Sequence, residues 1–192
     1  MFMKKIVILM SAAFMLGQSG LFAANKILSS APVTGSAFRQ GAWYVGGSLG
    51  LGSGLGYLGG AALMANAEYA VTNEIGIGGT IGYWGYSESI NSAGYTTKYS
   101  YSIIPIVASG TFHLPMKVSN LDLGVGISLG YYAVSSSIDS NVAGFNYASA
   151  SGSGIAWGIF GLARYFINDT LALRGKIGYG ITVLEVGVDF RF

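Results

Sequence analysis

The sequence predicts an all-β protein, an eight-stranded antiparallel transmembrane β-barrel preceded by a cleavable signal peptide. Only 9% of the 192 residues are charged and 52% are hydrophobic, whereas a soluble domain carries about 25% charged residues. Beyond the N-terminal region, no run reaches the roughly 18 uncharged apolar residues of a spanning helix. Apolar residues recur instead at every second position, which is the period of a strand. These observations exclude an ordinary soluble domain and a helical membrane protein.

Residues 1–23 have the features of a secretory signal peptide. Two lysines precede an apolar run over Ile6–Leu16, and small residues follow it. The run is too short to span a bilayer, which argues against an N-terminal anchor helix. Cleavage is expected after Ala23, with Ala24 as the alternative.

The barrel domain is predicted over residues 42–192. Residues 24–41 show no strand period and are expected to form a short, flexible periplasmic lead-in. Alternation is clearest in Val183–Phe192, where apolar and charged residues take turns. Pro105 cannot donate a ladder hydrogen bond, and a slip of register there would exchange the faces of residues 98–103. The eight expected strands are residues 43–52, 62–72, 74–86, 98–113, 121–132, 154–166, 171–179 and 183–192.

Short and long connections alternate along the predicted barrel. In bacterial barrels the short turns are periplasmic and the longer loops lie outside. The expected periplasmic turns are residues 72–73, 114–120 and 167–170. The expected outer loops are residues 52–60, 87–97 and 135–153, and the fourth outer connection, near residues 180–181, is almost absent.

Charged residues fall on the inward-facing positions of the predicted strands. Opposite signs occupy neighbouring strands, and the last hairpin can place Lys176 across from Glu185. We expect a salt-bridged network that fills the lumen, with an ion path as the alternative, because unpaired buried charges cost several kcal/mol each. The candidate residues are Glu68, Arg164, Arg174, Lys176, Glu185, Asp189 and Arg191. Many glycines share the inward positions, as expected where the lumen of eight strands is only just wide enough for side chains.

The sequence offers little for catalysis, metals or cofactors, and we expect none of them. His113 is the sole histidine, and no carboxylate is expected to orient its ring towards the nearby hydroxyls of Ser109 and Thr111. The chain has no cysteine, which excludes disulfides and thiolate metal sites. Without the two lysines of the leader, eight basic residues face eight acidic ones, so no nucleic-acid partner is expected.

Aromatic residues suggest two roles. Those on outward positions near both ends of the strands are expected to form the interfacial girdles of a barrel. Others fall in the predicted outer loops, where exposed aromatic side chains often contact partners. The candidate loop contacts are Tyr95, Phe145 and Tyr147.

The final strand Leu184–Phe192 ends on an aromatic residue with apolar residues at alternate positions before it. Ala163–Phe166 is followed by Asn168 and Asp169, which is typical of a penultimate hairpin. With the signal peptide and eight alternating segments, the chain resembles small outer-membrane β-barrel proteins of the OmpX, OmpA and opacity type over residues 42–192. The almost absent fourth outer loop departs from members that use this loop as a surface epitope.

The resemblance implies location in the outer membrane of a Gram-negative type envelope and no enzymatic activity. It implies that Phe190 and Phe192 present a signal to the barrel assembly machinery. Outer-membrane lipid and lipopolysaccharide would surround a monomeric barrel. We expect a structural or adhesion-like role through the outer loops with an unknown surface partner, and a small pore or conduit for ions or an apolar solute is the alternative.

Overall fold

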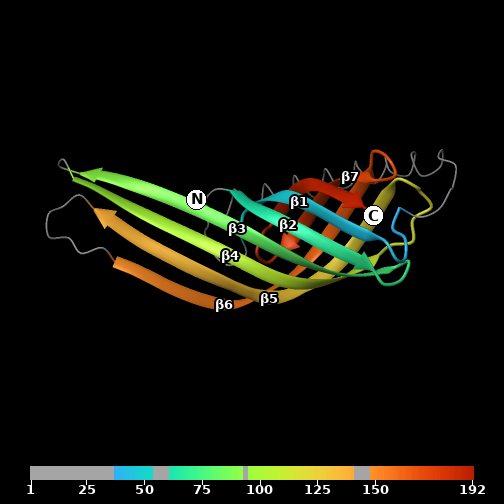
Figure 1. Cartoon of the computed structure of the whole chain (residues 1–192), viewed down its shortest axis with the longest axis horizontal. Coiled ribbons are helices and arrows are strands. Elements are labelled where there is room, and N and C mark those ends of the chain that lie inside the picture. The colour runs from blue at the N-terminus through green and yellow to red at the C-terminus, as the bar shows by residue number, and fades with distance from the viewer. Residues whose placement is uncertain (1–36, 54–60, 93–94, 141–147) are drawn as a thin grey trace, which may run out of the picture.

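A computed structural model describes residues 37–53, 61–92, 95–140 and 148–192 as a closed β-barrel (Figure 1). Each strand pairs antiparallel with its neighbours in sequence, and β1 pairs with β8 to close the ring. This confirms the predicted fold class; the signal peptide lies outside the described residues. The strands are β1 (Trp43–Leu51), β2 (Ala61–Ala70), β3 (Ile75–Ser92), β4 (Tyr95–His113), β5 (Leu121–Ser140), β6 (Ala148–Phe166), β7 (Leu171–Tyr179) and β8 (Leu184–Arg191).

The barrel is apolar outside and polar inside. On β5, Val125, Ile127 and Leu129 point outward and are more than half exposed, whereas the alternate residues face the lumen. Buried charged residues lie inside the ring, and the outward band is rich in large apolar side chains. This inside-out arrangement is that of a barrel surrounded by hydrocarbon. In the described part of the chain, no helix is long and apolar enough to cross a membrane.

Four strands are longer than the sequence predicts. The predicted loops at residues 87–97 and 135–153 are largely strand, because β3 and β4 run on to Ser92 and Tyr95, and β5 and β6 to Ser140 and Ala148. These segments show only a sparse apolar alternation, because they extend past the ring (Figure 1), where neither face is covered by a packed lumen. We call this four-stranded part, residues 85–92, 95–102, 135–140 and 148–151, the extension.

The register of β4 continues through Pro105. Pro105 lies opposite Tyr132 of β5, and the pairs on both sides of it keep the same offset. The side chain is buried in the lumen. The slip considered from the sequence does not occur, and even-numbered residues of β4 face outward along the strand.

At the end of the barrel that holds the C-terminus, the connections at residues 114–120 and 167–170 have the predicted bounds, whereas the connection between β2 and β3 spans residues 71–74 rather than 72–73. Thr72 Oγ1 accepts hydrogen bonds from the backbone N–H groups of Glu74 and Ile75. Asn168 Oδ1 does the same for Thr170 and Leu171, at 2.9 and 2.8 Å. Side-chain oxygens that replace backbone acceptors are typical of tight turns. We call this end of the barrel the turn end.

The two faces of β5 are expected to respond differently to substitution. Ile127→Arg should lower the free energy of unfolding by about 2–4 kcal/mol, since it places a charge in hydrocarbon, and Ile127→Met should be nearly neutral. Gly126→Met should also destabilise, because a Cβ there would overlap the Phe160 ring and the Gly110 carbonyl. Urea unfolding in lipid vesicles measures all three variants. A harmless Gly126→Met would contradict the assigned faces.

Candidate functional site

Three carboxylates from three other strands surround the guanidinium of Arg164, on β6, inside the lumen. Arg164 Nε lies 2.5 Å from Asp189 Oδ2, Nη1 lies 3.0 Å from Asp122 Oδ2, and Nη2 donates to Glu68 Oε2. The arginine side chain is 2% exposed, so its charge depends on these partners for compensation. One residue thereby ties β6 to β2, β5 and β8.

His113, on β4, joins the same cluster. Its Nδ1 lies 2.7 Å from Asp122 Oδ1 and its Nε2 lies 3.2 Å from Glu68 Oε1. Each of these two carboxylates therefore faces both His113 and Arg164. Because both ring nitrogens face carboxylates, neither is free to activate a hydroxyl nucleophile.

Sequence reasoning missed this pair and was wrong that no carboxylate orients His113. Gly124 lies opposite His113 in the register, and Asp122, two residues away, points to the same side of β5. The alternating pattern of β5 is consistent with an inward Asp122. Its partner could be found only with the register between β4 and β5, which the sequence does not contain.

A second group of charges surrounds Glu185, which is fully buried on β8. Lys176 lies opposite it in the register, and Lys176 Nζ forms an ion pair with Glu185 Oε1. Thr182 Oγ1 donates to the same carboxylate at 2.5 Å, and Ser48 Oγ donates at 3.3 Å. Arg174 lies between the two groups, with Nη2 3.9 Å from Glu185 Oε2 and Nη1 3.9 Å from Asp189 Oδ1.

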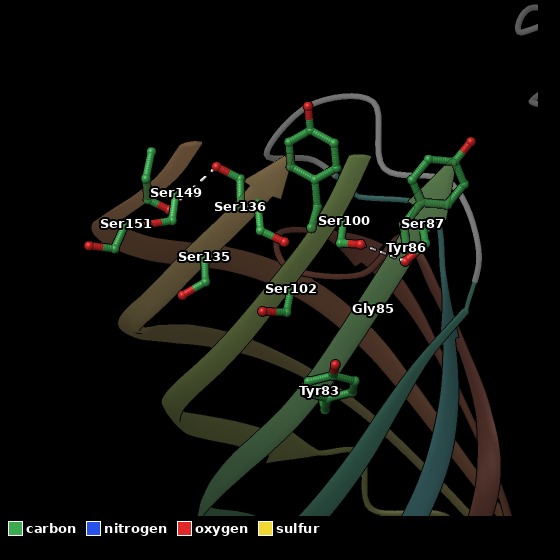
Figure 2. A pocket seen from close by; sticks show the side chains of 13 residues that line it. Tyr83, Gly85, Tyr86, Ser87, Ser100, Ser102, Ser135, Ser136, Ser149 and Ser151 are labelled. Carbon is green, nitrogen blue, oxygen red and sulfur yellow. Dashed lines mark hydrogen bonds between the residues drawn. The ribbon is translucent and has the colours of Figure 1, made fainter. Parts of the chain in front are cut away.

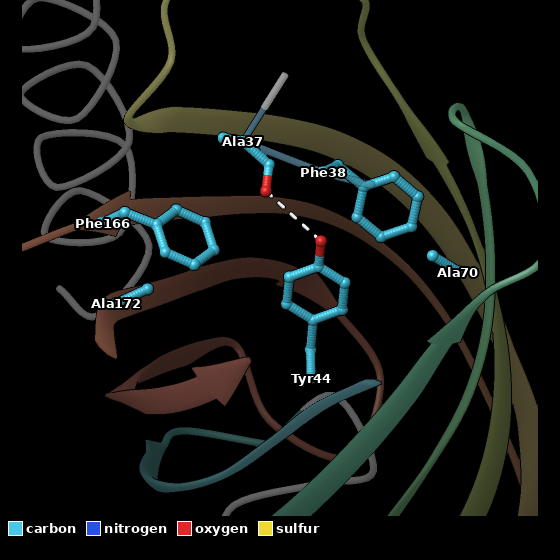
Figure 3. Close-up of a cluster of buried hydrophobic side chains, with 6 residues drawn as sticks. All are labelled: Ala37, Phe38, Tyr44, Ala70, Phe166 and Ala172. Carbon is cyan, nitrogen blue, oxygen red and sulfur yellow. Dashed lines mark hydrogen bonds between the residues drawn. The ribbon is translucent and has the colours of Figure 1, made fainter. Parts of the chain in front are cut away.

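Residues before β1 close the lumen at the turn end (Figure 3). The ring of Phe38 stacks on His113 with centroids 3.5 Å apart and on Tyr44 at 5.2 Å. Tyr44 Oη donates to the carbonyl of Ala37, and Arg191 Nη1 donates to the same carbonyl at 2.9 Å. Phe38 is 1% exposed. The expectation of a flexible lead-in is therefore wrong for residues 37–41, while residues 24–36 lie outside the described part.

Apolar side chains close the lumen at the other end. Met64, Trp84 and Ile103 are buried together with Ala62, and Ile181 packs against them from the connection between β7 and β8. Cavities beside Arg164 and beside Lys176 measure about 20 Å³ each, which is room for about one water molecule. The described lumen is thus filled by two end clusters with charges between them.

Other predicted residues lie on the outside. Phe190 is on the outward face of β8, and Phe192 is the most exposed of the large apolar residues at 75%. Phe192 extends the ladder, since its N–H donates to the Trp43 carbonyl at 2.9 Å and its carbonyl accepts from Trp43 N–H. Tyr95 is the exposed first residue of β4 rather than a loop residue. Phe145 and Tyr147 lie outside the described residues.

The extension has two different faces. The face that continues from the lumen side of Trp84 and Ile103 carries aromatic and aliphatic residues, and the opposite face carries serines. Tyr86, Tyr101 and Ile90 are 41%, 45% and 53% exposed. We call the first the aromatic face; it consists of Tyr86, Ile90, Tyr99, Tyr101 and Ile138.

No family model and no curated protein matches the sequence. Among solved structures, the Ail protein of Yersinia pestis in complex with the heparin analogue sucrose octasulfate matches with a TM-score of 0.55 at 14% identity, over 80% of this chain and all of that one. The N-terminal β-barrel domain of Pseudomonas aeruginosa OprF matches with a TM-score of 0.51 at 10% identity, over 80% of this chain and 98% of that one. The chain has the fold of these barrels. The resemblance found in the sequence is confirmed at this level.

Arg164→Met is expected to destabilise the barrel strongly. It leaves Glu68, Asp122 and Asp189 without their shared cation, and removing one partner of a buried ion pair typically costs about 3–5 kcal/mol. Urea unfolding in detergent, followed by tryptophan fluorescence, measures the change. Lys98→Met, on an exposed residue of the extension, is the control and should change stability little. A cost for Arg164→Met as small as that of the control would contradict the central role of Arg164.

Proposed function

We propose that this chain is a monomeric, non-enzymatic outer-membrane protein of a Gram-negative type envelope, with a closed lumen and a surface-interaction role. The proposal rests on the aromatic face. The extension presents this face beyond the band of large apolar side chains on the outside of the barrel, which we call the apolar belt. We assign a structural role to the buried charges around Arg164 and Glu185, because they form ion pairs with one another inside a filled barrel.

The apolar belt supports the membrane location. Its outward side chains would contact outer-membrane lipid and the acyl chains of lipopolysaccharide, and the turn end, with its short connections, would be periplasmic. Phe190 and Phe192 are exposed at the end of the last strand, where the barrel assembly machinery could reach them before the ring closes. The extension would then project from the cell surface.

The aromatic face supports the interaction role. Contiguous exposed apolar surface marks interaction sites, and tyrosine is enriched among residues that dominate binding energy. Tyr99 lies opposite Ile138 on β5 and Glu88 on β3, and Tyr101 lies opposite Tyr86. A regular sheet therefore presents these side chains on a rigid platform, which lowers the entropic cost of binding.

The charges of the extension favour a neutral partner. Ail is described in complex with a heparin analogue, and a sulfated ligand needs several basic side chains. In the described part of the extension, Lys98 is the one basic residue, and Glu88 and Asp139 are the two acidic residues. We therefore propose a protein surface with exposed apolar groups as the partner, rather than a sulfated glycan.

Adhesion is expected to depend on the aromatic face. Bacteria that display the full chain should bind an epithelial cell layer more strongly than bacteria without it. The double variant Ile90→Ser with Tyr99→Ser should lose most of this gain, because it removes apolar contact area without touching the barrel. Ser89→Ala, on the opposite face, is the matched control. Unchanged adhesion of the double variant, at equal surface levels and normal heat-modifiable migration, would overturn the role of this face.

The closed lumen argues against the alternative of a pore. Phe38 and Tyr44 fill one end, Trp84 and Ile103 fill the other, and the charges between them are paired. Refolded protein in a planar bilayer is therefore expected to show no steady conductance. Openings whose amplitude rises in proportion to salt concentration would overturn the closed-lumen assignment and favour a pore.

A further inference from the structure

The outward face of the extension carries two rows of small residues that cross all four strands (Figure 2), and every member is a serine except Gly85 on β3. Ser87 Oγ donates to Ser100 Oγ at 3.2 Å across β3 and β4. The register sets the rows: Ser87, Ser100, Ser137 and Ser149 form one, and Gly85, Ser102, Ser135 and Ser151 form the next. These serines line a hollow of about 550 Å³. Its size lies within the range of about 300–1,000 Å³ that is usual for small-molecule sites.

An aromatic ring bounds this hollow on the side of the apolar belt. A Cβ on Gly85 would lie 3.0 Å from the Tyr83 ring, so the absence of a side chain at Gly85 leaves room for the ring. Tyr83 is 53% exposed. The opposite-face residues Tyr86 and Tyr101 contribute to the lining, and none of the lining residues is charged.

The hollow lies directly beyond the apolar belt on the same outward face. Ile81, Ile106 and Tyr131 form an outward row of the belt. Ser102 precedes Ile106 by four residues on β4, which is about 13 Å along a strand. Tyr131 Oη donates to Ser153 Oγ between the belt and the serine rows. In a membrane-inserted barrel this is the level of the lipid headgroups.

We propose that this serine hollow binds the sugar headgroup of a glycolipid of the surrounding outer leaflet. Serine hydroxyls both donate and accept hydrogen bonds, as sugar hydroxyls do, and the Tyr83 ring offers apolar surface to the C–H face of a sugar. An uncharged lining suits neutral sugar units rather than phosphate or sulfate groups. The lipid-facing orientation selects a membrane glycolipid over a soluble glycan. The inference rests on the membrane orientation of the proposed function.

The test uses the full mature chain refolded in phosphatidylcholine nanodiscs that contain either rough-type lipopolysaccharide, with its core sugars, or lipid A alone. Native mass spectrometry counts retained glycolipid. Retention of the lipopolysaccharide should exceed that of lipid A at least tenfold. The double variant Ser102→Val with Ser135→Val should abolish this difference, because valine keeps the strand and removes the hydroxyls. Ser89→Val, on the same face but outside the hollow, is the matched control and should bind normally.

Three results would overturn the inference. Equal retention of lipid A and lipopolysaccharide would assign binding to acyl chains or phosphates. Full retention by the double variant would exclude the serine hollow. Equally tight binding of the free core oligosaccharide would assign the hollow to a soluble glycan.

A separate labelling experiment distinguishes this inference from the proposed function. The chain has no cysteine, so Ser89→Cys provides a single site for a membrane-impermeant maleimide on intact cells. If the cysteine is labelled from outside and glycolipid retention fails, the glycolipid inference is overturned and the proposed orientation stands. Failure to label folded protein on intact cells would overturn the proposed orientation.

Discussion

The barrel depends on compensation of one buried guanidinium. Arg164 meets Glu68, Asp122 and Asp189 where little water can enter. Hydrocarbon outside requires the polar side chains to lie inside, and the narrow lumen of eight strands requires them to pair with one another. The partners come from β2, β5 and β8, so a strand that slipped by one residue would send its carboxylate into lipid. The same interaction that satisfies the charge thus fixes the register of distant strands.

Space for these charges comes from missing side chains. A Cβ at Gly76 would overlap the carboxylate of Glu68, and one at Gly46 would overlap Asp189. These two glycines therefore lie where a charged side chain crosses a neighbouring strand. Glycine usually weakens a strand, but here its cost is offset by the buried ion pairs that it admits.

The sequence was sufficient for the barrel and for the pair of Lys176 with Glu185 in its last hairpin, but not for contacts between strands joined by longer connections. Alternation on β5, β7 and β8 identified their inward and outward residues, because each face has one uniform environment. Asp122 beside His113 could not be foreseen, since its position depends on the offset between strands. The burial of Phe38 was missed for another reason. The segment before β1 folds back into the end of the barrel without forming a strand, so its sequence shows no strand period. Residues 85–86 and 98–102 of the extension were predicted as strand. The rest was assigned to loops, because exposed strands can form without a clear apolar alternation.

In the extension, alternate residues still face opposite sides of the sheet, although the surroundings of each side differ from those in the barrel. On β4, Ile106 is exposed on the outward face and Val107 faces the lumen, while Ser102 and Tyr101, earlier in the same strand, occupy the corresponding faces of the extension. The outward side changes from aliphatic to hydroxyl where the proposed membrane placement puts the change from acyl chains to headgroups. The inward side changes from packed lumen to exposed aromatic face where the ring ends. Because the register of β4 is continuous through Pro105, the barrel that holds the charges also sets the orientation of both surfaces of the extension.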